Sequence, residues 1–229
     1  FAIFLITTMI FSSDIALEGD AGELQAYIKQ AAESTVDMSK PEQVPYKVHE
    51  ELIISIMQLY ESENTGKSTK EAIDIIAEKL KPIFEYTKKE GYIEYEVTTC
   101  TKTDEGTECD TDYYTKEFTL NLLTHVTAWN GYMTAEVIKT TGPWVTTVRN
   151  VGDDTTITTK SRAHSWYTEE QFTEDYSYYE QVLMSDPFNY GDTDLAIIEV
   201  LYMSSGRIMN YTDKKNQYSL GDWGAYLDV

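Results

Sequence analysis

The sequence is poor in the residues that build metal centres and nucleophilic sites. Its 229 residues include only two cysteines and three histidines. His49, His125 and His164 stand far apart, and no pair of them has the spacing of a zinc site or a known catalytic motif. Two cysteines without a nearby histidine also leave a zinc site half empty. The sequence therefore predicts no metal site and no cofactor.

Basic residues are scarce as well. Lys and Arg number 18 against 39 Asp and Glu, which gives a formal net charge of −21, and no basic stripe offsets it. So acidic a surface repels phosphate backbones and anionic lipid head groups. Nucleic acid is therefore excluded as a partner, and the charge fits a soluble surface outside the cell.

The clearest pattern that is present lies in Tyr92–Ile138. Apolar and aromatic side chains alternate with polar ones on both sides of a polar segment that joins Cys100 to Cys109. A period of two predicts half-buried β-strands, and Asp104 and Gly106 suit a turn between them. The pattern predicts a β-hairpin with a cysteine on each strand.

In such a hairpin the two cysteines face each other and can form a disulfide. Closing this loop would contribute about 3 kcal/mol by restricting the unfolded chain, and the bond would persist only in an oxidising compartment. Two reduced thiols in a loop are the alternative. We predict the Cys100–Cys109 disulfide, and with it a domain that faces outside the cytoplasm.

Helical periodicity flanks this region on both sides. Two amphipathic helices are expected over residues 48–60 and 68–83, the second starting at a capping box of Ser68 and Glu71. We expect both to pack against the sheet that begins at Tyr92.

Further turns and helices follow the first hairpin. An Asn130-Gly131 turn and two β-like runs around Gly152 predict additional hairpins. A helix over residues 168–183, starting at a capping box of Thr168 and Gln171, and another over residues 192–206, ending at Gly206, complete the pattern. The expected fold is α+β, with an antiparallel sheet of about five or six strands flanked by an N-terminal and a C-terminal helical pair.

The ends of the chain differ from this domain. Residues 1–13 begin with an uncharged apolar run, without Met or a basic flank, and we read them as the end of a membrane segment or signal. A buried apolar element of the fold is the alternative. Residues 14–45 are expected to form a stalk or linker with a short helix, 46–206 the extracytoplasmic domain, and 207–229 a polar tail or linker.

One short run carries an enzymatic resemblance. Val48–Ser62 is an apolar helix closed by a Glu-Ser pair, and it resembles the catalytic helix of lytic transglycosylases, in which that glutamate is the general acid. The resemblance implies that Glu61 cleaves peptidoglycan. The Gly-Leu-Met-Gln segment of that family is missing downstream, and Glu63 adds charge and solvation. A surface acid at a helix end is the alternative.

A wider resemblance rests on Val44–Tyr46, Leu80–Tyr86, Leu122–Gly131, Asp175–Leu183 and Asp194–Leu201. Together these segments resemble the extracytoplasmic region that precedes the catalytic domain in membrane-anchored cell-wall hydrolases of Gram-positive bacteria, their conjugative elements and phages. The resemblance spans residues 44–205. In that family a following domain performs the lytic chemistry, so no catalytic residue carries over to this chain.

The predicted function is a non-catalytic, membrane-anchored envelope module that positions a cell-wall-lytic or conjugation assembly by binding peptidoglycan or envelope proteins. The expected binding residues are aromatic side chains near turns and strand ends, namely Trp129, Tyr132, Trp144 and Trp166. Two alternatives remain: a transglycosylase-like hydrolase that uses Glu61, and an assembly subunit of a type IV secretion channel. The oligomeric state is not predicted.

Overall fold

A computed structural model describes residues 20–63 and 68–205, apart from the side chains of residues 20–21 and 61–63. The expected membrane or signal segment 1–13, the polar tail 207–229 and the helix cap Gly206 lie outside the described residues. None of the described helices is long and apolar enough to cross a membrane. The described chain is an α+β structure with one antiparallel sheet of five strands, as expected.

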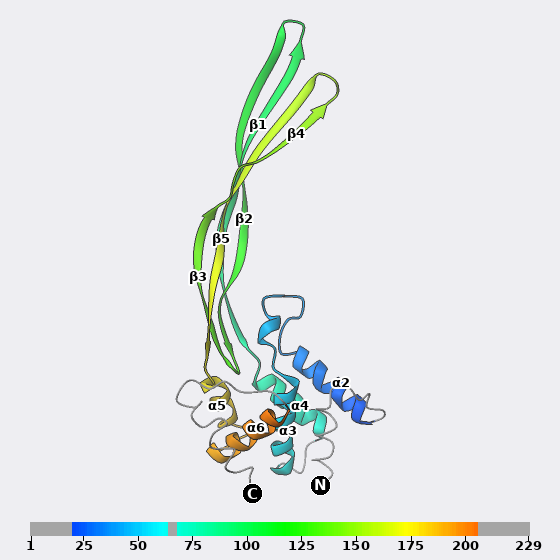
Figure 1. The fold of residues 1–229 in the computed structure, drawn as a ribbon, viewed down its shortest axis with the longest axis vertical. Coiled ribbons are helices and arrows are strands. Elements are labelled where there is room, and N and C mark those ends of the chain that lie inside the picture. The colour runs from blue at the N-terminus through cyan, green and yellow to red at the C-terminus, as the bar shows by residue number, and fades with distance from the viewer. Residues whose placement is uncertain (1–19, 64–67, 206–229) are drawn as a thin grey trace. The chain divides into compact units, whose positions relative to one another are not determined.

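The helices and strands follow one another in three blocks (Figure 1). The first block is helical and holds α2 (Asp20–Glu33), the 3-10 turn η1 (Val44–Tyr46), α3 (Glu50–Glu63) and α4 (Thr69–Lys79). The strands are β1 (Ile83–Thr103), β2 (Gly106–Ala128), β3 (Gly131–Thr141), β4 (Val145–Val151) and β5 (Thr155–Glu174). The last block holds α5 (Ser177–Leu183) and α6 (Asp192–Ser204).

The chain divides into two compact units. We call residues 1–84, 126–133 and 172–229 the helical unit, and residues 85–125 and 134–171 the sheet unit. The helical unit contains every described helix together with the turn between β2 and β3. The sheet unit contains most residues of each of the five strands.

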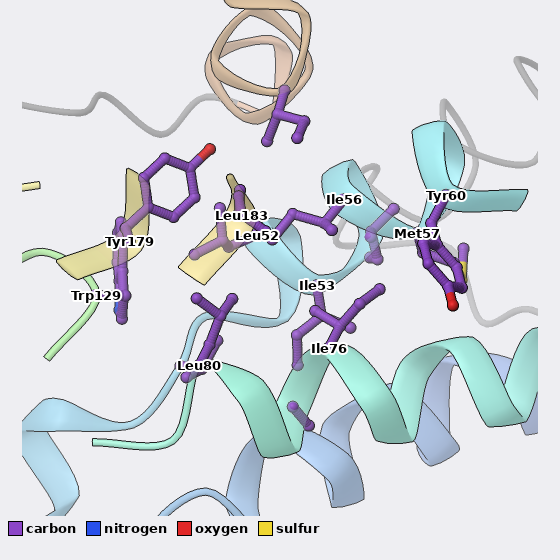
Figure 2. Packing of buried hydrophobic residues seen from close by; sticks show 14 of the residues in the cluster. Leu52, Ile53, Ile56, Met57, Tyr60, Ile76, Leu80, Trp129, Tyr179 and Leu183 are labelled. Atoms are coloured by element: carbon purple, nitrogen blue, oxygen red, sulfur yellow. The ribbon is translucent and has the colours of Figure 1, made fainter. Parts of the chain in front are cut away.

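A continuous apolar core holds the helical unit together. Six consecutive residues of α3, Leu52–Met57, are buried, and the one hydroxyl among them, Ser55 Oγ, donates to the Glu51 carbonyl at 2.7 Å. Figure 2 shows α3 side chains meeting those of α4, α5 and the β2–β3 turn in one cluster. The apolar face of α4 follows the predicted capping box, in which Ser68 and Glu71 bond each other's backbone N–H.

The first helices bury their apolar faces within the helical unit. The buried cluster around α3 takes only Trp129 from the strand region, at the β2–β3 turn. Since α3 is apolar around most of its circumference, α2, α4 and α6 all contact it. The expected packing of the first helices against the sheet at Tyr92 stays a prediction.

The expected helix start at Thr168 and Gln171 is also wrong. Both residues lie in β5, which runs on to Glu174, and α5 begins only at Ser177, whose N–H is bonded by the Asp175 carboxylate at 2.7 Å. Strand pairing prolongs β5 through a segment whose local signal favours a helix start, because tertiary contacts override a weak capping preference.

Three hairpins make up the sheet, β1–β2, β2–β3 and β4–β5, and β3 also pairs with β5 (Figure 1). The strand order is β1-β2-β3-β5-β4, and β1 also pairs with β5. These pairings close a ring of β1, β2, β3 and β5. At this ring Gly91 is buried, and a Cβ added there would lie 2.6 Å from the Phe118 ring and 2.7 Å from the His164 carbonyl.

Very little of the sheet unit is buried. All of its residues are described, and among them only Gly91 and Leu123 are buried. Every residue of β4 and most of the first half of β2 are exposed. The strands are therefore ordered by pairing rather than by an apolar core of their own.

Candidate binding surface

A ladder of paired side chains runs along one face of the sheet unit. Because β1 and β5 are antiparallel, Tyr92 stands opposite His164, Glu94 opposite Arg162, and Glu96 opposite Lys160. Alternate residues of a strand share a face, so these six side chains lie on the same side of the sheet. We call them, with the adjacent Trp144, the ladder face.

Hydrogen bonds fix the ladder face. Arg162 Nε donates to Glu94 Oε2 at 2.8 Å, and His164 Nε2 lies 3.0 Å from the same oxygen. Lys160 Nζ donates to Glu96 Oε1 at 2.8 Å. The His164 ring stacks on Tyr92 with centroids 4.3 Å apart.

Two carboxylates and two cations neutralise each other on this face, although the chain carries a formal charge of −21. The bond from Arg162, followed by that from His164, lowers the pKa of the Glu94 carboxyl. The Glu96 carboxylate raises the pKa of Lys160. The ladder face therefore stays zwitterionic at neutral pH, and a protein surface of either sign can approach it.

Trp144 is the most exposed aromatic residue of the ladder face. Its ring is 43% exposed, and the Arg162 guanidinium lies 4.6 Å from the ring centroid. The cation-π contact couples the indole to the Glu94–Arg162 pair, so the ring is held in one orientation. Exposed Trp and Arg side chains that are already fixed are the residue types that dominate protein interfaces.

Trp166 lies on β5, two residues beyond His164. Its Nε1 donates to the Glu90 carbonyl at 3.0 Å, and the ammonium groups of Lys89 and Lys139 lie 4.9 and 5.9 Å from its ring centroid. Trp166 is half-buried and engaged by these three groups, so it supports the sheet more than it offers a free surface.

The other two expected binding aromatics lie elsewhere. Trp129 is not at the surface: the residue is 3% exposed, and its ring packs against His49, Tyr176 and Tyr202 in the helical unit. Tyr132, on β3, is 37% exposed. The structure thus brings Trp144 together with a built polar cluster and does not gather the four predicted residues into one patch.

The described residues offer no structural support for the hydrolase hypothesis. Glu61 lies in the last turn of α3, but its side chain is outside the described part of the structure. Among the described residues no three His, Cys, Asp or Glu side chains come together as a metal site. His49 is bonded to Tyr202 at 2.6 Å in the core, and His164 belongs to the ladder face.

The predicted disulfide is present. Cys100 and Cys109 pair across the β1–β2 hairpin, with Cα atoms 4.1 Å apart. Sequence reasoning missed Glu94, Arg162 and His164 as site residues. The sequence did contain a signal, because Glu94 and Glu96 are two residues apart on one predicted strand, and Lys160 and Arg162 are two residues apart on another, so each pair shares one face of its strand. Only the strand register shows that the two pairs stand opposite each other.

Comparisons with known proteins identify no relative of this chain. No protein-family model matches the sequence, and no curated protein or solved structure shows significant similarity to it.

Proposed function

We propose that this chain is a non-catalytic binding module of a cell envelope, exposed to an oxidising compartment, and that its sheet unit binds a protein partner. In this role it positions a larger assembly, such as a cell-wall-lytic or conjugation machinery. The observation that carries the proposal is the exposure of the sheet unit, in which only Gly91 and Leu123 are buried.

Long strands without a core are costly to order and offer little stability of their own. Here they are pinned by a disulfide, a closed ring of pairings and the ladder of hydrogen bonds. These three constraints keep a wide surface rigid while leaving it accessible to a partner. A rigid surface loses less entropy on binding than a flexible one, which favours a recognition role.

The chemistry of the ladder face favours a protein over a polyanion. Its charges cancel locally, Trp144 and Arg162 are held in place, and the surrounding chain is strongly acidic. The Cys100–Cys109 disulfide favours an extracytoplasmic location, because cytosolic thiols are kept reduced. The family resemblance of residues 44–205 adds the cell wall as the setting.

Site-specific photo-crosslinking in the natural host tests this proposal. A photoreactive amino acid replaces Trp144 in the full chain, and the matched control replaces Gln25, an exposed residue of α2. We expect a protein adduct from position 144, identified by mass spectrometry, and none from position 25. The adduct should fall sharply when Arg162→Glu is added, because the partner then meets a reversed charge beside position 144.

Three outcomes would overturn the proposal. The absence of any protein adduct at position 144 removes the protein-binding role. Sedimentation of the purified chain with isolated peptidoglycan, without a protein adduct, would assign the surface to the wall itself. Release of soluble muropeptides that disappears in Glu61→Gln would instead support the hydrolase alternative.

A further inference from the structure

Strand β4 has one neighbour and one free edge. It pairs with β5 from Val145 opposite Ser161 to Val151 opposite Thr155, and it stands last in the strand order. In an antiparallel strand, alternate N–H and C=O groups point away from the neighbouring strand. Within the described part of the chain no further strand takes up these groups. β4 therefore presents a row of backbone donors and acceptors to solvent.

The composition of β4 does not guard that edge. Exposed edge strands are usually protected by lysine, proline, inward charges or a bulge. β4 reads Val-Thr-Thr-Val-Arg-Asn-Val, with no acid, lysine, proline or glycine. Its three valines, Val145, Val148 and Val151, are 56%, 63% and 45% exposed.

The opposite edge of the sheet is guarded. β2 is 23 residues long and β3 only 11, so the first half of β2 extends past the end of β3. That half carries Glu108, Asp110, Asp112 and Glu117. Like charges placed opposite each other destabilise strand pairing, so a second acidic copy is repelled at β2 and not at β4.

We propose that β4 pairs antiparallel with β4 of a second copy of this chain, about a two-fold axis at Val148. The valines are equally spaced along the strand, so this register sets Val148 against Val148 and Val145 against Val151 of the second copy. Arg149 then faces Thr147. The contact is self-complementary in hydrogen bonding, in apolar side chains and in charge.

Charge and strand overlap together favour this register. Moving the axis by one residue, to Arg149, sets two guanidinium groups directly opposite each other, which is unfavourable. Centring on Val148 also pairs all seven residues of β4, the longest overlap available. Because the same patch serves both copies, the pairing ends at a dimer and does not propagate into a fibre. The dimer is expected to be modest in affinity, since so short a strand pair forms a small interface.

Cysteine crosslinking of the purified full chain tests the proposal. Both natural cysteines are engaged in the Cys100–Cys109 disulfide, so an added cysteine is the only reactive thiol. Residues opposite each other in antiparallel strands have Cα atoms about 4.5–5.5 Å apart, within disulfide reach. Val148→Cys should form a covalent dimer on mild oxidation. Thr115→Cys, on an exposed position of β2, is the control and should stay monomeric.

A mixing experiment tests the register. Val145→Cys alone and Val151→Cys alone should crosslink slowly, whereas a mixture of the two should crosslink rapidly, because these positions face each other only across the two-fold axis. The proposal is overturned if Val148→Cys crosslinks no faster than Thr115→Cys, or if Val145→Cys alone crosslinks as fast as the mixture.

Sedimentation equilibrium of the cysteine-intact chain gives an independent reading. The natural chain should pass from monomer to dimer as concentration rises. Val148→Lys should weaken the dimer by about tenfold or more by placing two ammonium groups at the axis, whereas Thr115→Lys should not change it. A monomer at every concentration contradicts the proposal. These readings use purified chain alone, so they can fail or succeed independently of an adduct in the host that joins position 144 to a protein other than this chain.

Discussion

The helical unit and the sheet unit differ in how many of their side chains are buried. Around α3 the helical unit buries a continuous apolar cluster, and residues such as Leu52 and Ile53 are completely inaccessible to solvent. The strands β1 and β5, which lie mostly in the sheet unit, are 21 and 20 residues long, yet only Gly91 and Leu123 are buried in that unit. One unit conceals its apolar surface, and the other presents its surface to solvent.

The two units therefore contribute differently: the helical unit provides most of the folding stability, and the sheet unit provides most of the accessible surface. A fully buried Leu or Ile contributes roughly 1.5–3 kcal/mol, whereas a cross-strand pair on an open sheet contributes about 0.2–1 kcal/mol. The helical unit therefore carries most of the apolar stabilisation. The sheet unit depends on backbone pairing, a disulfide and polar ladders, which constrain its shape without covering its faces. A binding surface needs that combination of order and exposure.

The largest effect is expected from Ile53→Ala, in the core of the helical unit. Removing this fully buried side chain should lower the free energy of unfolding by about 2–5 kcal/mol, because a cavity forms in α3's surroundings. Val148→Ala, on the 63% exposed valine of β4, should change it by less than about 0.5 kcal/mol. Urea denaturation followed by circular dichroism measures both. Equal losses would contradict the contrast between the units.

Removing the disulfide should act locally on the sheet unit. In a Cys100→Ser, Cys109→Ser double variant, the end of the β1–β2 hairpin should open more easily by about 3 kcal/mol, because the disulfide no longer restricts the open chain. Hydrogen exchange should accelerate in residues 98–111, with little change in α3 and α4. A comparable acceleration in those helices would show that the two units share one cooperative transition.

A smaller effect is expected at Tyr179, in α5. Its hydroxyl is buried and has no hydrogen-bond partner among the described residues, and burial raises the pKa of its phenol. Tyr179→Phe should be neutral or stabilise the helical unit by up to about 1 kcal/mol. Tyr202→Phe is the matched control, because it removes a bond of 2.6 Å to His49 and should destabilise by about 1 kcal/mol. Thermal unfolding distinguishes the two signs.

The smallest effect concerns the ladder face. The bond from Arg162 is the first cause of the lowered pKa of Glu94, so Arg162→Gln should move that pKa back up toward the ordinary value of a glutamate. Because the folded-state pKa is below the unfolded one, the stabilisation is present above the unfolded pKa and lost as pH falls through the folded one. Carboxyl-carbon NMR titration measures the shift. An unchanged Glu94 titration in the variant would show that Arg162 does not hold the ladder.

Local signals predicted much of the fold. The capping box at Ser68, the Asn130-Gly131 turn and the cysteine-bearing hairpin are set by neighbouring residues, and the structure has all three. Features that depend on contacts between residues far apart in the sequence were not predicted. Thr168 carries a helix-start signal, yet pairing holds it in β5.

The candidate site was predictable only in part. Trp144 was chosen for its position near a strand end, and it does lie exposed beside Arg162. Trp129 met the same criterion and is buried, because the turn that carries it belongs to the helical core. The Glu94–Arg162 pair joins residues 68 positions apart, and strand parity alone cannot fix which residues of two strands stand opposite each other.

Residue-resolved native-state hydrogen exchange of the full chain tests the central contrast most directly. The account predicts that amides of Leu52–Met57 exchange only through global unfolding, whereas those of the sheet unit exchange through smaller openings, with β4 among the fastest paired strands. If the sheet amides were as strongly protected as those of α3 in dilute solution, the sheet unit would have a stability of its own that its exposed strands do not account for.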